Sequence, residues 1–325
     1  MSGNIKVSVI LPIYNVEKYI GECLRSVMSQ SLKDIEIICV DDCSPDGSME
    51  IVGKFAKDDK RIKIITHKKN LRQGGARNSG IEVARGEYIF FLDPDDFLSN
   101  DTVLRDLCDI AVENDAKIVN AKFQHYNNKV GQFCKLDNSL KLGGVLLQIL
   151  PDNFFELPFS ATVKLYHSSV FNDKNIRFEN NIIYEDVLFY FILFTKIKSV
   201  FLTNLTAIMY RSRTRSTTAL ADMDDNIKYD NCLKVVKLVF YYLKKNRLLT
   251  TYEKPFMKIC RRFYNTMNRK TSLKFKKEVN SFLNNQKVSF KIKFPLIRPV
   301  IKAILLFVPV KLWRRKLRRM LKNEL

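Results

Sequence analysis

Long apolar runs, paired cysteines and clustered histidines are all missing from this sequence of 325 residues. No stretch contains the roughly 18 consecutive apolar residues that a membrane-spanning helix needs. The polar amino terminus predicts that there is no secretory signal peptide. The seven cysteines include no Cys-x-x-Cys pair, so neither a disulfide framework nor a structural zinc site is expected. These absences favour a protein of the reducing cytoplasm.

Two common nucleotide-binding signatures are missing as well. The glycines Gly74, Gly75 and Gly80 do not form a Gly-x-Gly-x-x-Gly motif after a first strand, which argues against a dinucleotide-binding fingerprint. The sequence also lacks the Gly-x-x-x-x-Gly-Lys-Ser/Thr loop of P-loop proteins. Both classes of nucleotide-binding protein are therefore excluded.

Positive charge is concentrated at one end of the chain. Through residue 220, 28 Lys and Arg stand against 27 Asp and Glu, whereas the remaining 105 residues contain 27 against 7. The net charge of +21 therefore belongs almost wholly to the carboxyl-terminal third. Together with a change of hydrophobic pattern after Thr218, this predicts a large domain over 1–220, a helical accessory region over 221–290 and a basic tail over 291–325.

Short apolar strands alternate with helical patterns near the amino terminus. We expect strands over residues 7–12, 35–40, 61–66 and 88–92, with a helix after each of the first three. This alternation predicts an α/β fold in which helices flank a mostly parallel sheet. Ligands of such sheets bind outside the carboxyl ends of the strands. Side chains that follow these strand ends should therefore line one pocket.

The fourth strand is followed by three carboxylates, which belong to Asp93, Asp95 and Asp96. Asp93 and Asp95 can converge on one hard divalent cation, and Mg²⁺ and Mn²⁺ prefer such oxygen ligands. Taken alone, the short Asp-x-Asp-Asp pattern is more typical of a solvated acidic turn. Its position at the end of a buried strand favours a metal site, with Asp96 beside the reaction space.

Several segments occur in an order that is typical of one enzyme family. They span residues 7–15, 40–44, 76–80, 86–96, 164–166, 184–189 and 210–213. Together they resemble family 2 glycosyltransferases, the inverting nucleotide-sugar enzymes of the GT-A fold, among them bacterial capsule and lipooligosaccharide sugar transferases. Cys43, where the family usually has glycine, and the pair Gly74-Gly75 depart from the pattern without affecting a carboxylate. The resemblance implies a GT-A, Rossmann-like catalytic domain over 1–220.

The resemblance also implies a UDP-sugar donor, with the nucleotide at the ends of the first two strands. Tyr14 would lie against the pyrimidine, with Pro12 and Asn15 in the same site. Asp41 or Asp42 would accept a hydrogen bond from the ring N–H that uracil has and cytosine lacks. A uridine nucleotide is therefore favoured.

Glycosyl transfer from such a donor must stabilise the departing diphosphate. A Mn²⁺ or Mg²⁺ ion held by Asp93 and Asp95 would offset its charge as a Lewis acid. By resemblance, Arg77 contacts the nucleotide or supports the acidic cluster. Arg211 and Arg213 would close over the diphosphate, because guanidinium groups suit phosphate oxygens. A solvated loop is the alternative interpretation of these two later arginines.

The acceptor hydroxyl must lose a proton as it attacks the anomeric carbon from the face opposite the leaving group. We assign this role to Asp186, with Glu185 as the alternative base. Acidic residues also suit the start of a helix, and the apolar run 187–194 predicts one here. A purely structural role as the first turn of that helix is therefore the competing interpretation.

The carboxyl-terminal third reads as helical. Patterns over 227–245 and 252–268 predict two helices. In the tail over 291–325, Leu312, Trp313 and Leu317 recur at helical spacing opposite arginines, as in an amphipathic helix of a membrane interface. Prolines argue against a spanning helix, so we expect peripheral attachment to an anionic membrane at the cytoplasmic face. Packing on the protein's own core or on a second copy is the alternative.

The sequence thus predicts a metal-dependent, inverting glycosyltransferase. It would move a hexose or N-acetylhexosamine from a UDP-sugar to a hydroxyl of a bacterial surface glycan, for which a lipid-linked acceptor is expected. A basic nucleic-acid-binding protein is the main alternative, but no RNA- or DNA-binding module is recognisable. A sugar-phosphate nucleotidyltransferase would need a Gly-rich phosphate loop directly after the first strand. That place holds Pro12, Ile13, Tyr14 and Asn15.

Overall fold

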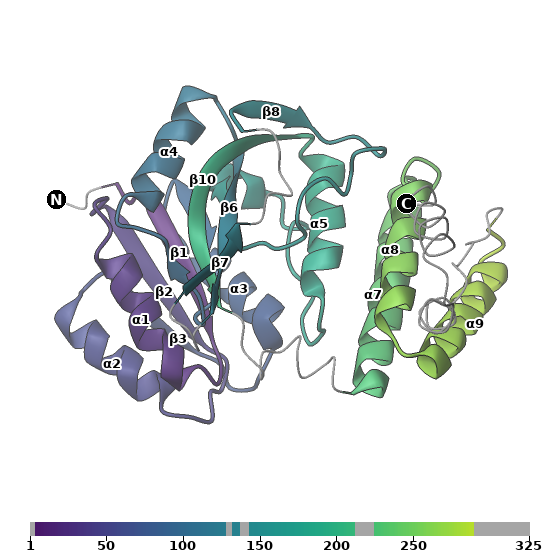
Figure 1. Ribbon diagram of the computed structural model, residues 1–325, viewed down its shortest axis with the longest axis horizontal. Helices are drawn as coiled ribbons and strands as arrows, with labels where there is room; N and C mark the ends of the chain where they lie inside the picture. The colour runs from purple at the N-terminus through teal and green to yellow at the C-terminus, as the bar shows by residue number, and fades with distance from the viewer. Residues whose placement is uncertain (1–3, 128–131, 137–142, 212–223, 289–325) are drawn as a thin grey trace, which may run out of the picture.

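The structure is a computed structural model that describes residues 4–127, 132–136, 143–211 and 224–288. Its first half consists of β1 (Val7–Ile13), α1 (Glu17–Met28), β2 (Ile35–Asp41), α2 (Ser48–Asp58), β3 (Ile62–Thr66), α3 (Arg72–Val83) and β4 (Tyr88–Phe91). These four strands pair in parallel in the order β3-β2-β1-β4. Every residue of β1 is buried, because helices cover both faces of the sheet (Figure 1).

The second half of the sheet is mixed. It consists of β5 (Phe97–Leu98), α4 (Val103–Glu113), β6 (Ile118–Asn127), β7 (Gln132–Leu136), β8 (Val145–Gln148), β9 (Lys164–His167), the 3₁₀ turn η1 (Ser168–Asn172), α5 (Glu185–Lys196) and β10 (Ser199–Arg211). Strand β9 lies between β4 and β6 and is antiparallel to both. Strand β10 is parallel to β6. The predicted α/β fold with flanking helices is confirmed, and its parallel part is the β3-β2-β1-β4 half.

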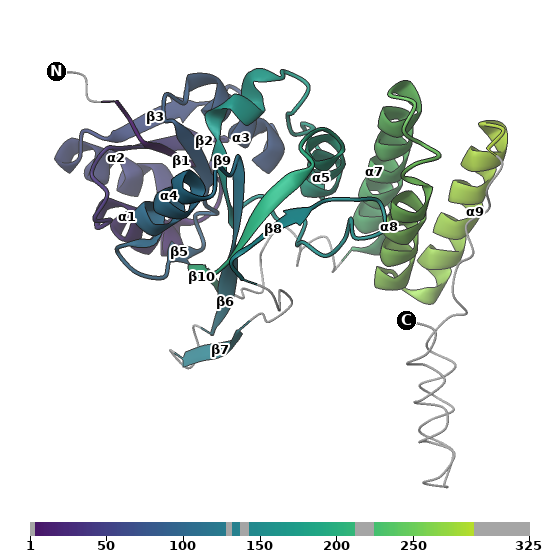
Figure 2. The ribbon, with the colours of Figure 1, turned by 90° about the horizontal axis from the view of Figure 1, so that it is seen from above.

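Two hydrophobic cores lie on opposite faces of this sheet. Val9 and Leu11 of β1 belong to the core under α1, α2 and α4, whereas Ile10 belongs to the core under α3 and α5. This division follows from the alternation of side chains along a strand. Figure 2 shows α1 and α4 on one side of the sheet and α3 on the other.

Three further helices extend the second core. They are α7 (Asp225–Lys245), α8 (Glu253–Thr266) and α9 (Arg269–Asn285), and they lie at one end of the molecule, where α7 packs against α5 and α9 packs against α7 and α8 (Figure 1). Val235 of α7, Phe256 of α8 and Phe275 of α9 are fully buried in the same core as Phe191 of α5. The first two helices match the predicted ones, and α9 lies in the region predicted to be helical, although no separate helix was predicted there. Among the described residues, no helix is long and apolar enough to cross a membrane.

The strand order brings distant segments to one edge. The carboxyl ends of β1, β2 and β4 lie together because these strands are parallel neighbours. Strand β10 pairs with β5 in antiparallel register, with Met209 opposite Phe97. Arg211, two residues beyond Met209, is thereby placed beside the acidic turn that follows β4.

Candidate active site

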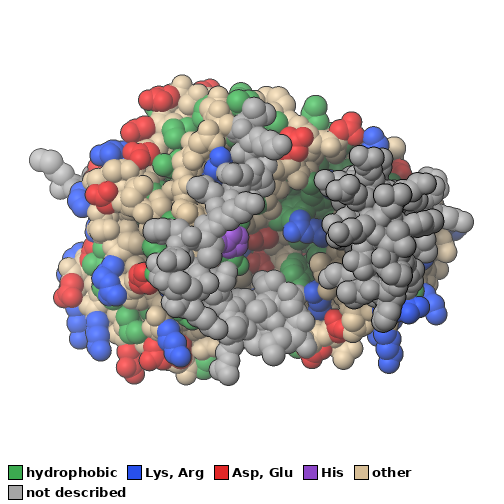
Figure 3. Space-filling view, in the orientation of Figure 1, with side chains coloured by type: hydrophobic (Ala, Val, Ile, Leu, Met, Phe, Trp, Pro, Cys, Tyr) green, Lys and Arg blue, Asp and Glu red, His purple; other side chains and the backbone are tan. Residues whose placement is uncertain are grey.

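Two adjoining cavities open at the carboxyl ends of β1, β2 and β4. The larger has a volume of about 720 Å³ and contains Asp93, Glu185 and Asp186. The smaller, of about 420 Å³, contains Tyr14 and Asp42. Asp95 and Glu185 line both cavities. Figure 3 shows acidic side chains at the bottom of a central hollow on this face. The predicted pocket is therefore present, and it has two compartments.

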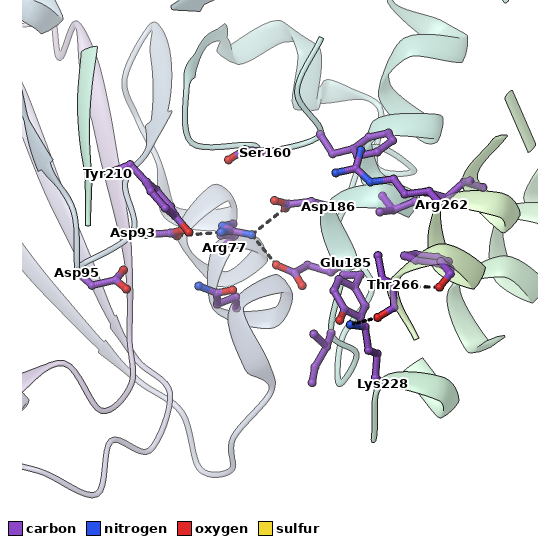
Figure 4. Close-up of a pocket in the computed structure, with 17 residues that line it drawn as sticks. Arg77, Asp93, Asp95, Ser160, Glu185, Asp186, Tyr210, Lys228, Arg262 and Thr266 are labelled. Carbon is purple, nitrogen blue, oxygen red and sulfur yellow. Dashed lines mark hydrogen bonds and ion pairs between the residues drawn. The ribbon is translucent and has the colours of Figure 1, made fainter. Parts of the chain in front are cut away.

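Arg77 of α3 joins the acidic residues of two distant segments (Figure 4). Its Nη1 donates to Oε1 of Glu185 at 2.8 Å and to Oδ1 of Asp186 at 3.0 Å, and its Nη2 donates to Oδ1 of Asp93 at 2.9 Å. The side chain is only 1% exposed. Of the two predicted roles, the structure places Arg77 in the one that supports the acidic cluster.

Glycines bring Arg77 to this position. A Cβ atom on Gly80 would lie 2.4 Å from Cγ2 of Ile10, so glycine lets α3 pack closely against β1. A Cβ atom on Gly74 would lie 2.5 Å from the backbone oxygen of Glu179, in the segment that leads to α5. The Gly-rich segment is therefore the close-packed part of α3 itself.

The three predicted carboxylates after β4 do converge. One oxygen from each of Asp93, Asp95 and Asp96 lies within 4.8 Å of the others. The turn is closed by the Asp96 N–H, which donates to the Asp93 carbonyl at 2.9 Å. Burial, together with the charges of Asp95 and Asp93, raises the pKa of Asp96 well above its usual range. This set of hard oxygen donors fits a divalent cation such as Mn²⁺ or Mg²⁺.

Glu185 and Asp186 form the first turn of α5, directly after Tyr184, which has a left-handed backbone (φ 67°). Burial raises the pKa of Glu185 to about 7, and burial also raises the pKa of Asp186. The Ala161 N–H faces the Asp186 carboxylate and lowers its pKa. The side chain of Asp186 is 24% exposed, against 7% for Glu185. Glu185 and Asp186 therefore both begin the helix and line the cavity. The structural role in the first helical turn and the role as a base do not exclude each other.

The smaller cavity contains the predicted nucleotide residues Pro12, Tyr14 and Asp42. Tyr14 is 47% exposed at its edge. Oδ1 of Asp42 accepts from the Leu71 N–H at 2.7 Å and lies 2.8 Å from Nδ1 of His67. By contrast, Asp41 turns toward its own loop, where Oδ1 accepts from the Ser44 N–H at 2.9 Å. Of the two candidates, Asp42 is the one that faces the cavity.

Asn15 is also a loop residue, whose backbone N–H donates to Oγ of Ser44 at 2.9 Å. Its φ is 53°, in the left-handed region that asparagine tolerates better than most residues. Asn15 is not one of the described residues that line the two cavities. In this structure it shapes the loop after β1.

Arg211 lies against the acidic turn that follows β4. Its Nε donates to the Asp95 carbonyl at 2.8 Å, and its Nη2 pairs with Glu22 at 2.6 Å. Its backbone N–H donates to Oδ1 of Asp96 at 2.8 Å. The prediction missed this role because it depends on the β5–β10 pairing, which the local sequence does not encode. Arg213 lies outside the described residues.

The sequence assigned no site residue to the carboxyl-terminal helices, yet they form one wall of the larger cavity. Lys228 of α7 and Arg262 and Phe263 of α8 line it, and Figure 4 shows Lys228 and Arg262 on the side of the cavity away from Asp93 and Asp95. The guanidinium of Arg262 stacks on Phe159, 4.9 Å from the ring centre. The mixture of basic and aromatic residues in these helices was the only signal for this wall.

Residues 8–177, more than half of the chain, match the sequence profile of glycosyl transferase family 2. The chain belongs to glycosyl transferase family 2. Among curated members, a Haemophilus influenzae glycosyltransferase is 30% identical over 244 residues, which are 73% of this chain and 93% of that protein. The glycosyltransferase EpsJ of Bacillus subtilis is 34% identical over 223 residues, which are 66% of this chain and 63% of EpsJ. The predicted family is thus confirmed.

Solved structures of similar fold support the GT-A-like architecture of this family 2 member. The S. aureus protein TarS, in complex with UDP-GlcNAc, has a TM-score of 0.58 at 21% identity, covering 86% of this chain and 85% of that one. The mannosyltransferase PcManGT from Pyrobaculum calidifontis, in complex with GDP-Man and Mn²⁺, has a TM-score of 0.55 at 13% identity, covering 95% and 83%. At these identities the likeness concerns the fold.

Proposed function

We propose that the protein is a metal-dependent, inverting glycosyltransferase that uses a UDP-sugar. It would transfer a hexose or N-acetylhexosamine to a hydroxyl of a bacterial surface glycan. The observation that carries this proposal is the bridge from Asp93 through Arg77 to Asp186, which joins the acidic turn after β4 to the acids of α5 within the larger cavity. TarS binds UDP-GlcNAc and PcManGT binds GDP-Man with Mn²⁺, which supports a nucleotide-sugar and a metal here.

The smaller cavity would hold the nucleotide. Tyr14 offers an exposed ring against which a pyrimidine can stack. The contacts of Asp42 with His67 and with the Leu71 N–H both use Oδ1, so Oδ2 would accept the ring N–H of uracil. Cytosine has no such donor, which supports the preference for a uridine nucleotide.

The region shared by the two cavities would hold the diphosphate. A divalent cation bound by Asp93 and Asp95 would supply Lewis-acid stabilisation of the leaving group. The protein's own part is to hold these ligands in place. Arg77 fixes Asp93 from one side, and Arg211 fixes the turn from the other through the Asp95 carbonyl and the Asp96 carboxylate.

Asp186 would accept the proton of the acceptor hydroxyl. Of the two acids on α5, its side chain is the more exposed to the larger cavity, and Glu185 remains the alternative base. A raised pKa brings a carboxylate closer to the pH at which proton transfer is efficient. Attack from this side, opposite the diphosphate, would invert the anomeric centre.

The larger cavity would receive the acceptor, between the acidic residues and the wall formed by α7 and α8. A poly(ribitol-phosphate) β-glucosyltransferase from Bacillus spizizenii is 38% identical over 128 residues, which are 38% of this chain and 20% of that protein, and this supports a polymer as acceptor. In this proposal the catalytic domain spans 1–220, the helical accessory region 221–290 and the basic tail 291–325. The tail over 291–325 lies outside the described residues, and its membrane role is likewise proposed.

Calorimetric titration with UDP tests the nucleotide and the metal together. The wild type should bind UDP more tightly with Mn²⁺ than with a chelator, and Asp95→Asn should lose that difference. Asp109→Asn, an exposed change on α4 away from the cavities, is the matched control and should behave as wild type. Metal-independent UDP binding would contradict the proposal. Binding of oligonucleotides with a steep salt dependence would favour the nucleic-acid alternative.

A further inference from the structure

The loop over residues 158–161 is held by a buried lysine that the proposed mechanism does not use. Nζ of Lys164, on β9, donates to the Ser160 carbonyl at 2.7 Å and to the Pro158 carbonyl at 3.0 Å. The side chain is fully buried, which is rare for lysine because an ammonium group loses its hydration. Two neutral carbonyls compensate that loss only in part, so a negative charge is needed nearby.

Asp186 supplies that charge. Burial lowers the pKa of Lys164 to about 7, and the negative charge of Asp186 opposes this shift. In return the charge of Lys164 lowers the pKa of Asp186. The Ala161 N–H of the same loop faces Asp186 and lowers its pKa, and Ser160 lines the larger cavity together with Asp186. Lys164 therefore acts on Asp186 in two ways, through the loop and through its charge.

We propose that Lys164 is a positioning residue that holds the 158–161 loop against Asp186 and so aligns the base with the acceptor. This inference rests on the proposed function. Arg77 donates a hydrogen bond to Asp186, and the Ala161 N–H of the loop faces the same carboxylate and lowers its pKa. Without Lys164 the Ala161 N–H would move away from Asp186 with the loop. A shift of about 1 Å at a reacting group can reduce the rate on the order of 100-fold.

If Lys164 positions the base, changing it should lower the rate of UDP release and leave the affinity for UDP unchanged. Among the described residues, none of 158–164 lines the smaller cavity, so UDP binding should not depend on the loop. A purely structural role would instead affect stability alone. Leu165 provides the control, because it is the next residue on β9 and its side chain is buried in the other core.

The experiment compares Lys164→Met and Leu165→Ala with the wild type. The probes are calorimetric titration with UDP and Mn²⁺, and UDP release from a UDP-sugar with water as acceptor, at a temperature where all three proteins are folded. Lys164→Met should keep UDP affinity within about twofold while UDP release falls at least about tenfold. Leu165→Ala should lose stability but keep both UDP affinity and rate.

The pH dependence of UDP release gives a second readout. Arg77, Asp93, Glu185, Tyr166 and Lys164 are the charged or titratable groups that act on Asp186, and Lys164→Met removes one positive charge among them. The acid limb of the pH–rate profile should therefore move to higher pH in this variant, and it should stay in place in Leu165→Ala.

Tyr166→Phe covers the case in which Lys164→Met does not fold. The Tyr166 hydroxyl donates to the Ala161 carbonyl at 3.1 Å, so this change loosens the same loop without removing a charge. It should reduce UDP release in the same direction and to a smaller extent. Wild-type UDP release by Lys164→Met, or a parallel loss of UDP affinity, would overturn the inference. A wild type that binds no UDP would refute the proposed function instead.

Discussion

Arg77→Met should be the most destabilising single change in the candidate active site. The guanidinium makes three charged contacts of 2.8–3.0 Å with Asp93, Glu185 and Asp186. Removing it leaves three neighbouring carboxylates without their shared cation. Loss of one partner from a buried ion pair typically costs about 3–5 kcal/mol, so we expect the free energy of unfolding to fall by that amount near pH 8.

The loss of unfolding free energy in Arg77→Met should become smaller as the pH falls. A carboxyl whose pKa is raised in the folded state favours that state at low pH, and this contribution is lost as the pH rises through the folded pKa. Burial already raises the pKa of Glu185 from 4.5 to about 7, although Arg77 lowers it. Without Arg77 the pKa should rise further, so folded Arg77→Met takes up protons more readily than the unfolded chain. Its deficit relative to wild type should therefore be smaller near pH 5.5 than near pH 8.

Urea unfolding at the two pH values measures both effects. Arg105→Met is the control, because Arg105 pairs with Asp106 at 3.5 Å and half of its side chain is exposed. An exposed pair of this kind contributes less than about 1 kcal/mol. Equal losses for the two arginine variants, or a deficit of Arg77→Met that does not change with pH, would refute the account of Arg77 as the buried counter-ion.

Three further outcomes follow from the proposed site. Asp186→Asn should bind UDP as wild type but lose transfer, since only proton acceptance is removed; a parallel loss in calorimetric UDP affinity would make the residue structural. His67→Gln should weaken UDP binding about fivefold, because one hydrogen bond that orients Asp42 is disturbed, whereas an unchanged dissociation constant would contradict this role. Deleting residues 291–325 should abolish sedimentation with anionic vesicles, and equal sedimentation of both proteins would indicate that the tail packs within the protein.

The sequence predicted those parts of the fold that depend on local patterns. Strands β1 to β4 follow from apolar runs, and the acidic turn follows from its position after one of them. Helix α9 could have been found too, because Phe275, Val279 and Leu283 are buried at spacings of four residues. It was missed because the prediction stopped at Asn268, where lysines dominate the composition.

Contacts between distant residues could not be predicted in the same way. The partners of Arg77 are 16, 108 and 109 residues away in sequence, so its role as a shared counter-ion depends on the packing of α3 against α5. Likewise, the position of Arg211 beside the acidic turn depends on the pairing of β5 with β10. The wall that α7 and α8 add to the larger cavity arises from their packing beside α5, which no motif marks.

UDP release from a panel of UDP-sugars, with Mn²⁺ present, tests the central claim most directly. The account predicts that the wild type releases UDP from at least one UDP-sugar, and that excess chelator or Asp95→Asn abolishes this release while the protein stays folded. Undiminished release in chelator or by Asp95→Asn would contradict the metal role. No release from any UDP-sugar, together with turnover of another nucleotide sugar, would contradict the assignment of the uridine nucleotide.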